Sequence, residues 1–227
     1  MRLLCVLCVL SVLAAAPSRA ADEQARAVVR QWVEAGVKVK SLEIDFVQER
    51  RLRSLRQPLT KPGKIWFQRP GSFRWQIGDP PAIIAVSKPG GDLAVIESKE
   101  KRFRVWTADE LAAEAASGKG HGFAMAGSSF PASLESFERQ FEIVSARETA
   151  EAGVWDLHLD LRDRKAGIFV KEIVFTIQPA DGALRKFDVI MRDGSVQTTR
   201  ITSVKKNGAI PPGVFAPDVS GYESPRK

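Results

Sequence analysis

The sequence predicts an α+β protein in which antiparallel β-sheet dominates. Roughly nine to eleven short segments alternate apolar and polar residues, and turn-forming residues separate them at even spacing. This pattern is typical of a sandwich or a barrel. Apolar residues recur at helical spacing in two other regions, and no internal repeat or low-complexity linker divides the chain.

The N-terminal residues predict a cleaved export signal. Met1-Arg2 supplies a positive start, residues 3–16 form an apolar run, and Ser18 and Ala20 place small residues at the minus-three and minus-one positions of a cleavage site. The run is shorter than the ~18–20 apolar residues that a membrane-spanning helix needs. We therefore expect a signal peptide over residues 1–20, cleaved near Ala20, and a single periplasmic domain over residues 21–227.

Cysteine usage and charge limit the chemistry of the mature chain. Cys5 and Cys8 are the two cysteines, and each follows a leucine inside the apolar run, so neither can be a lipidated N-terminus. The mature chain is then expected to have no disulfide and no thiolate. Without Arg2 and Arg19 it keeps 32 basic and 27 acidic residues, a net charge of +5. For an exported protein this charge favours acidic partners or an anionic membrane surface over nucleic acid.

The expected order of elements starts with an amphipathic helix over Asp22–Ala35, which Asp22 caps and Gly36 ends. The middle of the chain is expected to hold a helical segment over residues 108–116 and a glycine-rich loop over residues 118–129. A second short helix carries Leu134, Phe137 and Phe141. Strands are expected over residues 42–47, 65–67, 73–77, 83–87, 93–97, 102–106, 155–162, 169–177, 184–191 and 196–204, with Pro58, Pro62 and Gly63 interrupting the chain before the second strand and Asp193-Gly194 forming a hairpin turn.

Catalytic and metal-binding patterns are weak. His121 and His158 lie far apart and lack metal-ligand spacing, and His158 falls on the polar face of a strand. Ser128 and Ser129 follow a glycine but lack the Gly-x-Ser-x-Gly frame of a nucleophile turn. We expect no enzyme activity, no cofactor and no metal, while an exported hydrolase that uses residues 120–129 remains an alternative of another class.

The apolar faces of the N-terminal strands allow two interpretations. Phe46, Phe67, Phe73 and Trp75 fall on the apolar side of alternating segments. By pattern alone they favour the core of an ordinary sandwich. The other interpretation is a cavity for a lipid chain, which gains ~0.8 kcal/mol for each buried methylene without stereospecific contacts.

One block favours the cavity. Phe46-Val47-Gln48, followed by Gly63-Lys64-Ile65-Trp66-Phe67-Gln68-Arg69-Pro70-Gly71-Ser72-Phe73-Arg74-Trp75, resembles the LolA family of periplasmic outer-membrane lipoprotein carriers. In that family a Phe-x-Gln element in the first strand precedes a glycine-containing strand, an Arg-Pro turn and a Phe-x-Trp strand. The elements at residues 192–194 and 207–215 fall where the family has similar ones.

The resemblance implies a fold and a function. The fold would be an unclosed antiparallel β-barrel, a half-barrel, with a lid of short α-helices over a hydrophobic cavity. The protein would shield the acyl chains of lipoproteins and pass them from an inner-membrane ABC-type transporter complex to an outer-membrane receptor, as a monomer. The turn at residues 87–91 and the element at residues 214–217 differ from the family pattern, so a periplasmic carrier or sensor of another amphiphile, such as a glycolipid, remains an alternative.

The resemblance and the strand pattern together name candidate site residues. Ile65, Phe67 and Arg69 share parity on one strand, so Arg69 should project toward the apolar side, where its charge needs a hydrogen-bonding partner. By resemblance Arg69 is the latch that holds the lid closed, with partners expected in the helical middle of the chain. The expected cargo cavity is lined by Leu42, Ile44, Phe46, Ile65, Phe67, Phe73, Trp75 and Ile77.

Overall fold

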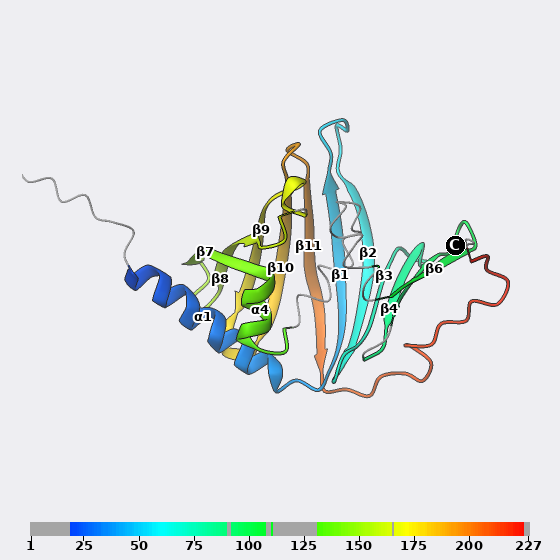
Figure 1. Cartoon of the computed structure of the whole chain (residues 1–227), viewed down its shortest axis with the longest axis horizontal. Helices are drawn as coiled ribbons and strands as arrows, with labels where there is room; N and C mark the ends of the chain where they lie inside the picture. Colours follow the sequence, from blue (N-terminus) through cyan, green and yellow to red (C-terminus); the bar gives the residue numbers. More distant parts are fainter. Residues whose placement is uncertain (1–18, 90–91, 108–109, 111–130, 165, 225–227) are drawn as a thin grey trace, which may run out of the picture.

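The computed structural model describes residues 19–89, 92–107, 110, 131–164 and 166–224. In these residues a single 11-stranded antiparallel sheet carries two α-helices, so the predicted α+β class and unclosed sheet are confirmed (Figure 1). The spatial order is β6-β5-β4-β3-β2-β1-β11-β10-β9-β8-β7. The strands are β1 (Ser41–Arg51), β2 (Leu59–Gln68), β3 (Ser72–Ile77), β4 (Ile83–Ser87), β5 (Leu93–Glu97), β6 (Arg102–Trp106), β7 (Phe141–Glu148), β8 (Trp155–Leu161), β9 (Val170–Gln178), β10 (Ala183–Met191) and β11 (Val196–Lys206).

The first and last strands meet at the centre of the sheet. β1 and β11 pair from Leu42 opposite Lys206 to Arg51 opposite Val196. All other neighbours are consecutive in the chain and joined as antiparallel pairs. The seam between β1 and β11 therefore joins an N-terminal half, β1 to β6, to a C-terminal half, β7 to β11, and leaves β6 and β7 as the two free edges.

Helix α1 (Arg19–Val37) is longer at both ends than the predicted Asp22–Ala35. Alanines after Arg19 are strong helix formers, and they extend the helix so that Asp22 lies in its first turn, where a carboxylate is favourable. Gly36 lies inside the last turn and does not end the helix. Its apolar stripe, formed by Ala25, Val28, Val29, Trp32 and Val33, is buried.

The second helix is shorter than predicted, and the strand after it was missed. Helix α4 (Leu134–Gln140) starts at a capping box between Ser133 and Ser136. Phe141, which helical spacing from Phe137 placed in the helix, is instead the first residue of β7. The pairing of β7 with β8 overrides that local pattern, although Phe141 is buried as expected.

Strand β2 runs through the residues that were expected to interrupt the chain. Pro62 and Gly63 lie inside β2 opposite Val47 and Phe46 of β1. Pro62 lies where the β2–β3 ladder ends, since that pairing starts at Gly63. Its carbonyl accepts a hydrogen bond from the amide of Gly78, just after β3, and the end of a ladder tolerates a residue without an N–H. Gly63 leaves the space that the ring of Phe46 occupies.

Two separate clusters form the core. The larger one packs α1 and α4 on the sheet formed by β7 to β10 (Figure 1), and the smaller one lies on β1 to β6. The larger cluster contains Val28, Val29, Trp32, Val33, Phe137, Phe141, Leu157, Leu159, Ile173, Phe175, Ile177, Leu184, Phe187 and Val189. The smaller cluster contains Ile44, Phe46, Ile65, Phe73, Trp75, Ile77, Ala85, Val95 and Trp106.

The C-terminal segment after β11 returns to the opposite half of the molecule. It runs past the ends of β1 to β4 and reaches the edge strand β6 (Figure 1). The carbonyl of Val214 accepts a hydrogen bond from Nη1 of Arg74, and the carbonyl of Glu223 accepts one from the amide of Phe103. Glu223 thereby pairs with part of the otherwise free edge of β6.

Other expectations have mixed outcomes. The Asp193-Gly194 hairpin is confirmed, with Gly194 at positive φ between β10 and β11. The expected helical segment at residues 108–116 falls almost entirely outside the described residues. The glycine-rich loop at residues 118–129 and the apolar part of the signal peptide lie outside them too. None of the helices within the described ranges has the length and apolar character needed to cross a membrane.

Replacement of Gly63 tests the close packing of the smaller cluster. A Cβ at residue 63 would lie 2.1 Å from Cζ of Phe46 and 2.7 Å from the backbone oxygen of Gln76. Gly63→Ala should therefore displace the Phe46 ring and lower the free energy of unfolding by ~1–3 kcal/mol, measured by urea denaturation. Gly71→Ala is the matched control, because no heavy atom lies within 4 Å of its Cβ. Equal stability of the two variants would contradict this account.

Candidate functional site

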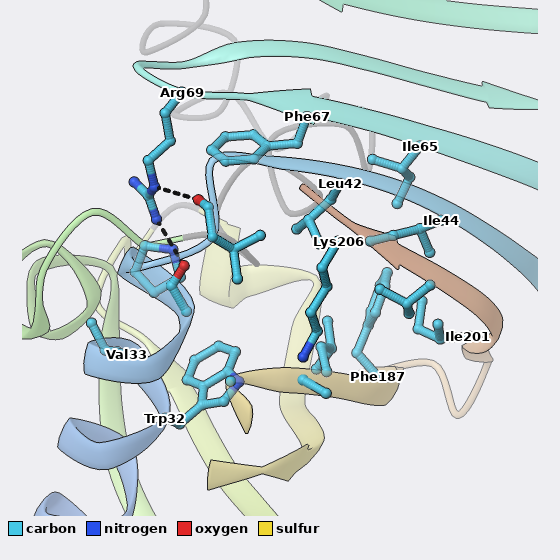
Figure 2. A pocket seen from close by; sticks show the side chains of 17 residues that line it. Trp32, Val33, Leu42, Ile44, Ile65, Phe67, Arg69, Phe187, Ile201 and Lys206 are labelled. Atoms are coloured by element: carbon cyan, nitrogen blue, oxygen red, sulfur yellow. Dashed lines mark hydrogen bonds between the residues drawn. The ribbon is translucent and has the colours of Figure 1, made fainter. Parts of the chain in front are cut away.

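An apolar cavity of about 50 Å³ lies where the two core clusters meet. It is positioned by the end of α1 on one side and by the central strands β2, β1, β11 and β10 on the other (Figure 2). Its lining residues are Trp32, Val33, Gly36, Val39, Leu42, Ile44, Ile65, Phe67, Arg69, Pro131, Gly182, Ala183, Leu184, Phe187, Ile201, Val204 and Lys206.

The predicted site residues divide into two groups. Leu42, Ile44, Ile65, Phe67 and Arg69 line this cavity. The other four lie farther along the strands, inside the smaller core cluster, and do not line it. There the rings of Phe46 and Trp75 stack at 5.8 Å, and Phe73 and Ile77 are buried against the same cluster.

Sequence reasoning missed the part of the cavity lining that comes from the larger core cluster. Trp32 and Val33 come from α1, and Leu184 and Phe187 come from β10. A signal for the helical residues was present, because an amphipathic helix must cover an apolar surface with its stripe. Which surface it covers depends on tertiary packing, since α1 precedes β1 in the chain and yet lies over β7 to β10.

A β-bulge explains how β11 contributes to the cavity. Ile201 and Val204 are three residues apart and would face opposite sides of a regular strand. Asp45 pairs with Ser203 while Phe46 pairs with Ile201, so Thr202 is an extra residue in β11. This irregularity turns both apolar side chains toward the same face, and both line the cavity.

Arg69 joins the end of β2 to the end of α1. Its Nε donates to the carbonyl of Val39 at 3.0 Å and its Nη2 donates to the carbonyl of Gly36 at 3.3 Å (Figure 2). Gly36 lies in the last turn of α1, where carbonyls lack helical partners and the helix dipole favours a cation. In the part of the chain that the structure describes, Arg69 binds the end of the first helix. The helical segment at residues 108–116, where partners were expected, lies almost entirely outside the described residues.

The environment of Arg69 is partly apolar. The guanidinium lies 5.5 Å from the centre of the Phe67 ring. Desolvation lowers the pKa of Arg69 below its ordinary value, but a guanidinium stays protonated at physiological pH. Arg69 therefore brings a permanent charge to the cavity, held by backbone carbonyls.

A second cation lies at the cavity. Nζ of Lys206 donates to the backbone oxygen of Asp181 at 2.7 Å and forms an ion pair with its carboxylate at 3.2 Å. Next to Asp181, Gly182 has a φ of 67°, and a Cβ there would lie 2.5 Å from the backbone nitrogen of Gly36. Two glycines thus allow the turn before β10 to touch the end of α1, close to Lys206 and Arg69.

The indole N–H of Trp32 is a polar group buried in the wall of the cavity. Trp32 is 3% exposed, and its Nε1 has no hydrogen-bonding partner among the residues that the structure describes. Phe137 and Phe175 hold the ring edge-on, with ring centres at 5.9 and 6.2 Å. A buried N–H without a partner costs ~1–3 kcal/mol, so this arrangement is expensive for a side chain whose only role is packing.

Residues considered for catalysis or metal binding lie elsewhere. His158 is half-buried on β8 and its Nδ1 contacts the carboxylate of Glu172. His121, Ser128 and Ser129 lie outside the described residues. Among the residues that are described, no group of three or more His, Cys, Asp or Glu side chains is placed to hold a metal ion.

The sequence of the N-terminal half of the sheet matches a known protein family. Residues 37–117 match the model of the family described as outer membrane lipoprotein carrier protein LolA. This stretch contains β1 to β6 and Arg69. No curated protein matches the sequence significantly.

Solved structures resemble a larger part of the chain. An uncharacterized conserved protein from Thermus thermophilus has a TM-score of 0.55 at 8% identity, covering 90% of this chain and 99% of that one. A DUF1329 family protein from Desulfovibrio piger has a TM-score of 0.50 at 10% identity, covering 86% and 97%. A putative outer membrane lipoprotein-sorting protein domain from Vibrio parahaemolyticus has a TM-score of 0.49 at 11% identity, also covering 86% and 97%.

Sequence identities this low indicate a similar fold alone. The family match, in contrast, rests on sequence and covers the N-terminal half of the sheet. Residues 37–117 are therefore similar in sequence to the LolA family, and the α+β fold of the chain, an unclosed antiparallel sheet with helices, is LolA-like.

Proposed function

We propose that this protein is a periplasmic carrier that shields the acyl chains of outer-membrane lipoproteins and passes them from the inner to the outer membrane. The observation that carries the proposal is the apolar cavity between α1 and the central strands, in a chain whose sequence matches the LolA family at the strands that build one cavity wall. The proposed partners are an acylated lipoprotein cargo, an inner-membrane ABC-type transporter complex and an outer-membrane receptor.

The cavity must widen to hold a cargo. Its volume of about 50 Å³ is small beside the ~150 Å³ that accommodates a benzene molecule in an apolar protein cavity. Its walls belong to two different core clusters, with Trp32 and Val33 on one side and Ile44 and Ile65 on the other. Separating the end of α1 from β1 and β2 would enlarge it without dismantling either cluster. Each buried methylene of a cargo chain would then contribute ~0.8 kcal/mol.

Arg69 is the proposed latch of this opening. Its two hydrogen bonds tie the end of β2 to the carbonyls of Gly36 and Val39, which are the backbone groups that must move away if the cavity widens. The latch therefore acts on the end of α1. The proposed export fits this geometry, because cleavage near Ala20 would remove only the first residues of α1 and leave its apolar stripe intact.

A second candidate function is a carrier or sensor of another amphiphile. Arg69 and Lys206 both line the cavity, and two cations beside an apolar space suit a lipid with an anionic headgroup. Native mass spectrometry of protein purified from periplasm separates the two candidates by the mass of the bound cargo. The serines considered for an exported hydrolase lie outside the described residues.

Filling the cavity should weaken binding of an acyl chain. Ile201 is half-buried and lines the cavity, so Ile201→Trp should occupy space that a chain needs. Loss of contact for about two methylene groups predicts roughly tenfold weaker binding of a fluorescent fatty-acyl probe that lipid displaces from the wild-type protein. Fluorescence titration measures both binding and displacement.

The matched control introduces the same side chain outside the cavity. Val144 on β7 is 54% exposed and does not line the cavity, so Val144→Trp should bind the probe like the wild type. The carrier function would be refuted by a folded wild-type protein that binds neither probe nor lipid. Equal binding by both variants would show that acyl chains bind elsewhere.

Arg69→Leu should unlatch the end of α1 while the protein stays folded, because leucine suits the apolar side of β2. Hydrogen bonds to a charged group are worth ~1.5–3 kcal/mol, so amide hydrogen exchange at residues 36–40 should accelerate about tenfold or more. Because the substitution removes this stabilisation from the closed form without cargo, the affinity for cargo should stay the same or increase. Release of a loaded acyl probe to acceptor phosphatidylcholine vesicles should become about tenfold slower.

Arg74→Leu is a suitable control for the latch. Arg74 projects from the other face of the sheet, donates to Gln76 and to the carbonyl of Val214, and has its pKa lowered by desolvation like Arg69. Its replacement should accelerate exchange near Val214 and leave both residues 36–40 and release unchanged. Normal release from Arg69→Leu, or global unfolding of that variant, would show that Arg69 is not a latch.

A further inference from the structure

We propose that the indole N–H of Trp32 is a binding site for the carbonyl oxygen of an acyl chain, so that the cavity selects acyl esters and amides over plain alkyl chains. The proposal rests on the carrier function proposed above and names the chemical group that the cavity recognises. It starts from Nε1 of Trp32, which is buried in the cavity wall and finds no hydrogen-bonding partner within the described part of the chain.

The orientation of the indole is fixed by its neighbours. Phe137 and Phe175 pack edge-on against the ring, and the adjacent Val29 and Val33 are buried in the same cluster. Because these contacts lie on the side of the larger core cluster, the ring cannot turn to find a partner without breaking them. Figure 2 shows the indole nitrogen directed toward the side on which Lys206 and Phe187 lie. The donor is thus held at the cavity.

Other polar side chains of the cavity already have partners. Arg69 donates to the carbonyls of Gly36 and Val39, and Lys206 donates to Asp181. Of the buried side-chain donors on the described lining residues, the indole N–H of Trp32 alone is unsatisfied. A ligand that enters the cavity therefore meets one free donor in an apolar wall.

The missing partner is better supplied by a ligand than by water. A buried water needs two to four polar partners, and the wall around Trp32 offers its single N–H beside apolar side chains. An indole N–H donates and cannot accept, so the ligand must bring an acceptor. A carboxylate at this depth would lose hydration at high cost, whereas a neutral ester or amide carbonyl accepts one hydrogen bond and continues into an apolar chain.

Chemically matched ligands test this site. The probes are a 1-acyl lysophosphatidylcholine and the 1-alkyl ether of equal chain length, which lacks the carbonyl oxygen. Each displaces a fluorescent acyl probe from the intact protein. The wild type should bind the acyl form about fivefold more tightly, the effect of one neutral hydrogen bond. Trp32→Phe should bind both lysolipids equally, because phenylalanine keeps an aromatic ring in the wall and removes the donor.

Trp66→Phe provides the control. Trp66 also has a buried Nε1 without a partner, but it projects from the other face of β2, between Lys64 and Arg74. Its replacement should leave the fivefold preference intact. Should Trp32→Phe fail to fold, the indole N–H resonance of Trp32 in the wild-type protein gives a second readout, and it should shift downfield with the acyl form and not with the ether.

The outcomes separate this proposal from the carrier function. Equal affinity of the wild type for the two lysolipids, a preference that survives in Trp32→Phe, or a preference lost equally in Trp66→Phe would each overturn the carbonyl site and leave the carrier function standing. Failure of the wild type to bind either lysolipid would overturn the carrier function, and the carbonyl site with it.

Discussion

The pairing of the first strand with the last is the constraint on which the rest of the structure depends. Because β1 and β11 lie side by side, the chain leaves the seam toward one edge, at β6, and must resume at the opposite edge, at β7, before it returns to the seam. The described sheet is open because its two edge strands, β6 and β7, do not pair with each other. Helix α1 enters directly before β1, so its C-terminal end is tethered at the seam while its apolar stripe lies over β7 to β10. The cavity forms where that cover ends and the N-terminal half begins.

Alternation of apolar and polar residues was sufficient to predict most of the strands, and the unclosed form of the sheet followed from the resemblance to the LolA family. The alternation failed where pairing with a neighbouring strand overrides the local pattern. Phe137 and Phe141 have helical spacing, yet Phe141 opens β7 because β8 offers a row of backbone partners. Pro62 and Gly63 resemble a turn, yet β1 holds both in a strand. In each case the deciding contact comes from a residue distant in sequence, which no window along the chain contains.

The residues that line the cavity were predictable from the sequence in part, as the strands were. Parity along β1 and β2 placed Leu42, Ile44, Ile65, Phe67 and Arg69 on the apolar side, and all five line the cavity. The pattern could not show where along the strands the cavity stops, so Phe46 and Trp75, stacked in the smaller cluster, were assigned to it as well. It also could not reveal the bulge at Thr202, which reverses parity within β11 and brings Ile201 and Val204 to one face. Bulges are set by the neighbouring strand and leave little trace in composition.

The two clusters differ in a way that suits a container with one movable wall. Trp32 of α1 packs against Phe137 and Phe175, which with Phe141 form a network of rings whose centres lie between 5.0 and 6.5 Å apart. The last turn of α1 is held from the end of β2 by Arg69, whose side chain donates to the carbonyls of Gly36 and Val39. Movement of that turn would therefore disturb few apolar contacts, while the sheet and the larger cluster keep the fold intact. Under the proposed carrier function, a cavity whose opening depends on hydrogen bonds from Arg69 would be loaded and emptied at modest cost, which a site enclosed within the aromatic network would not allow.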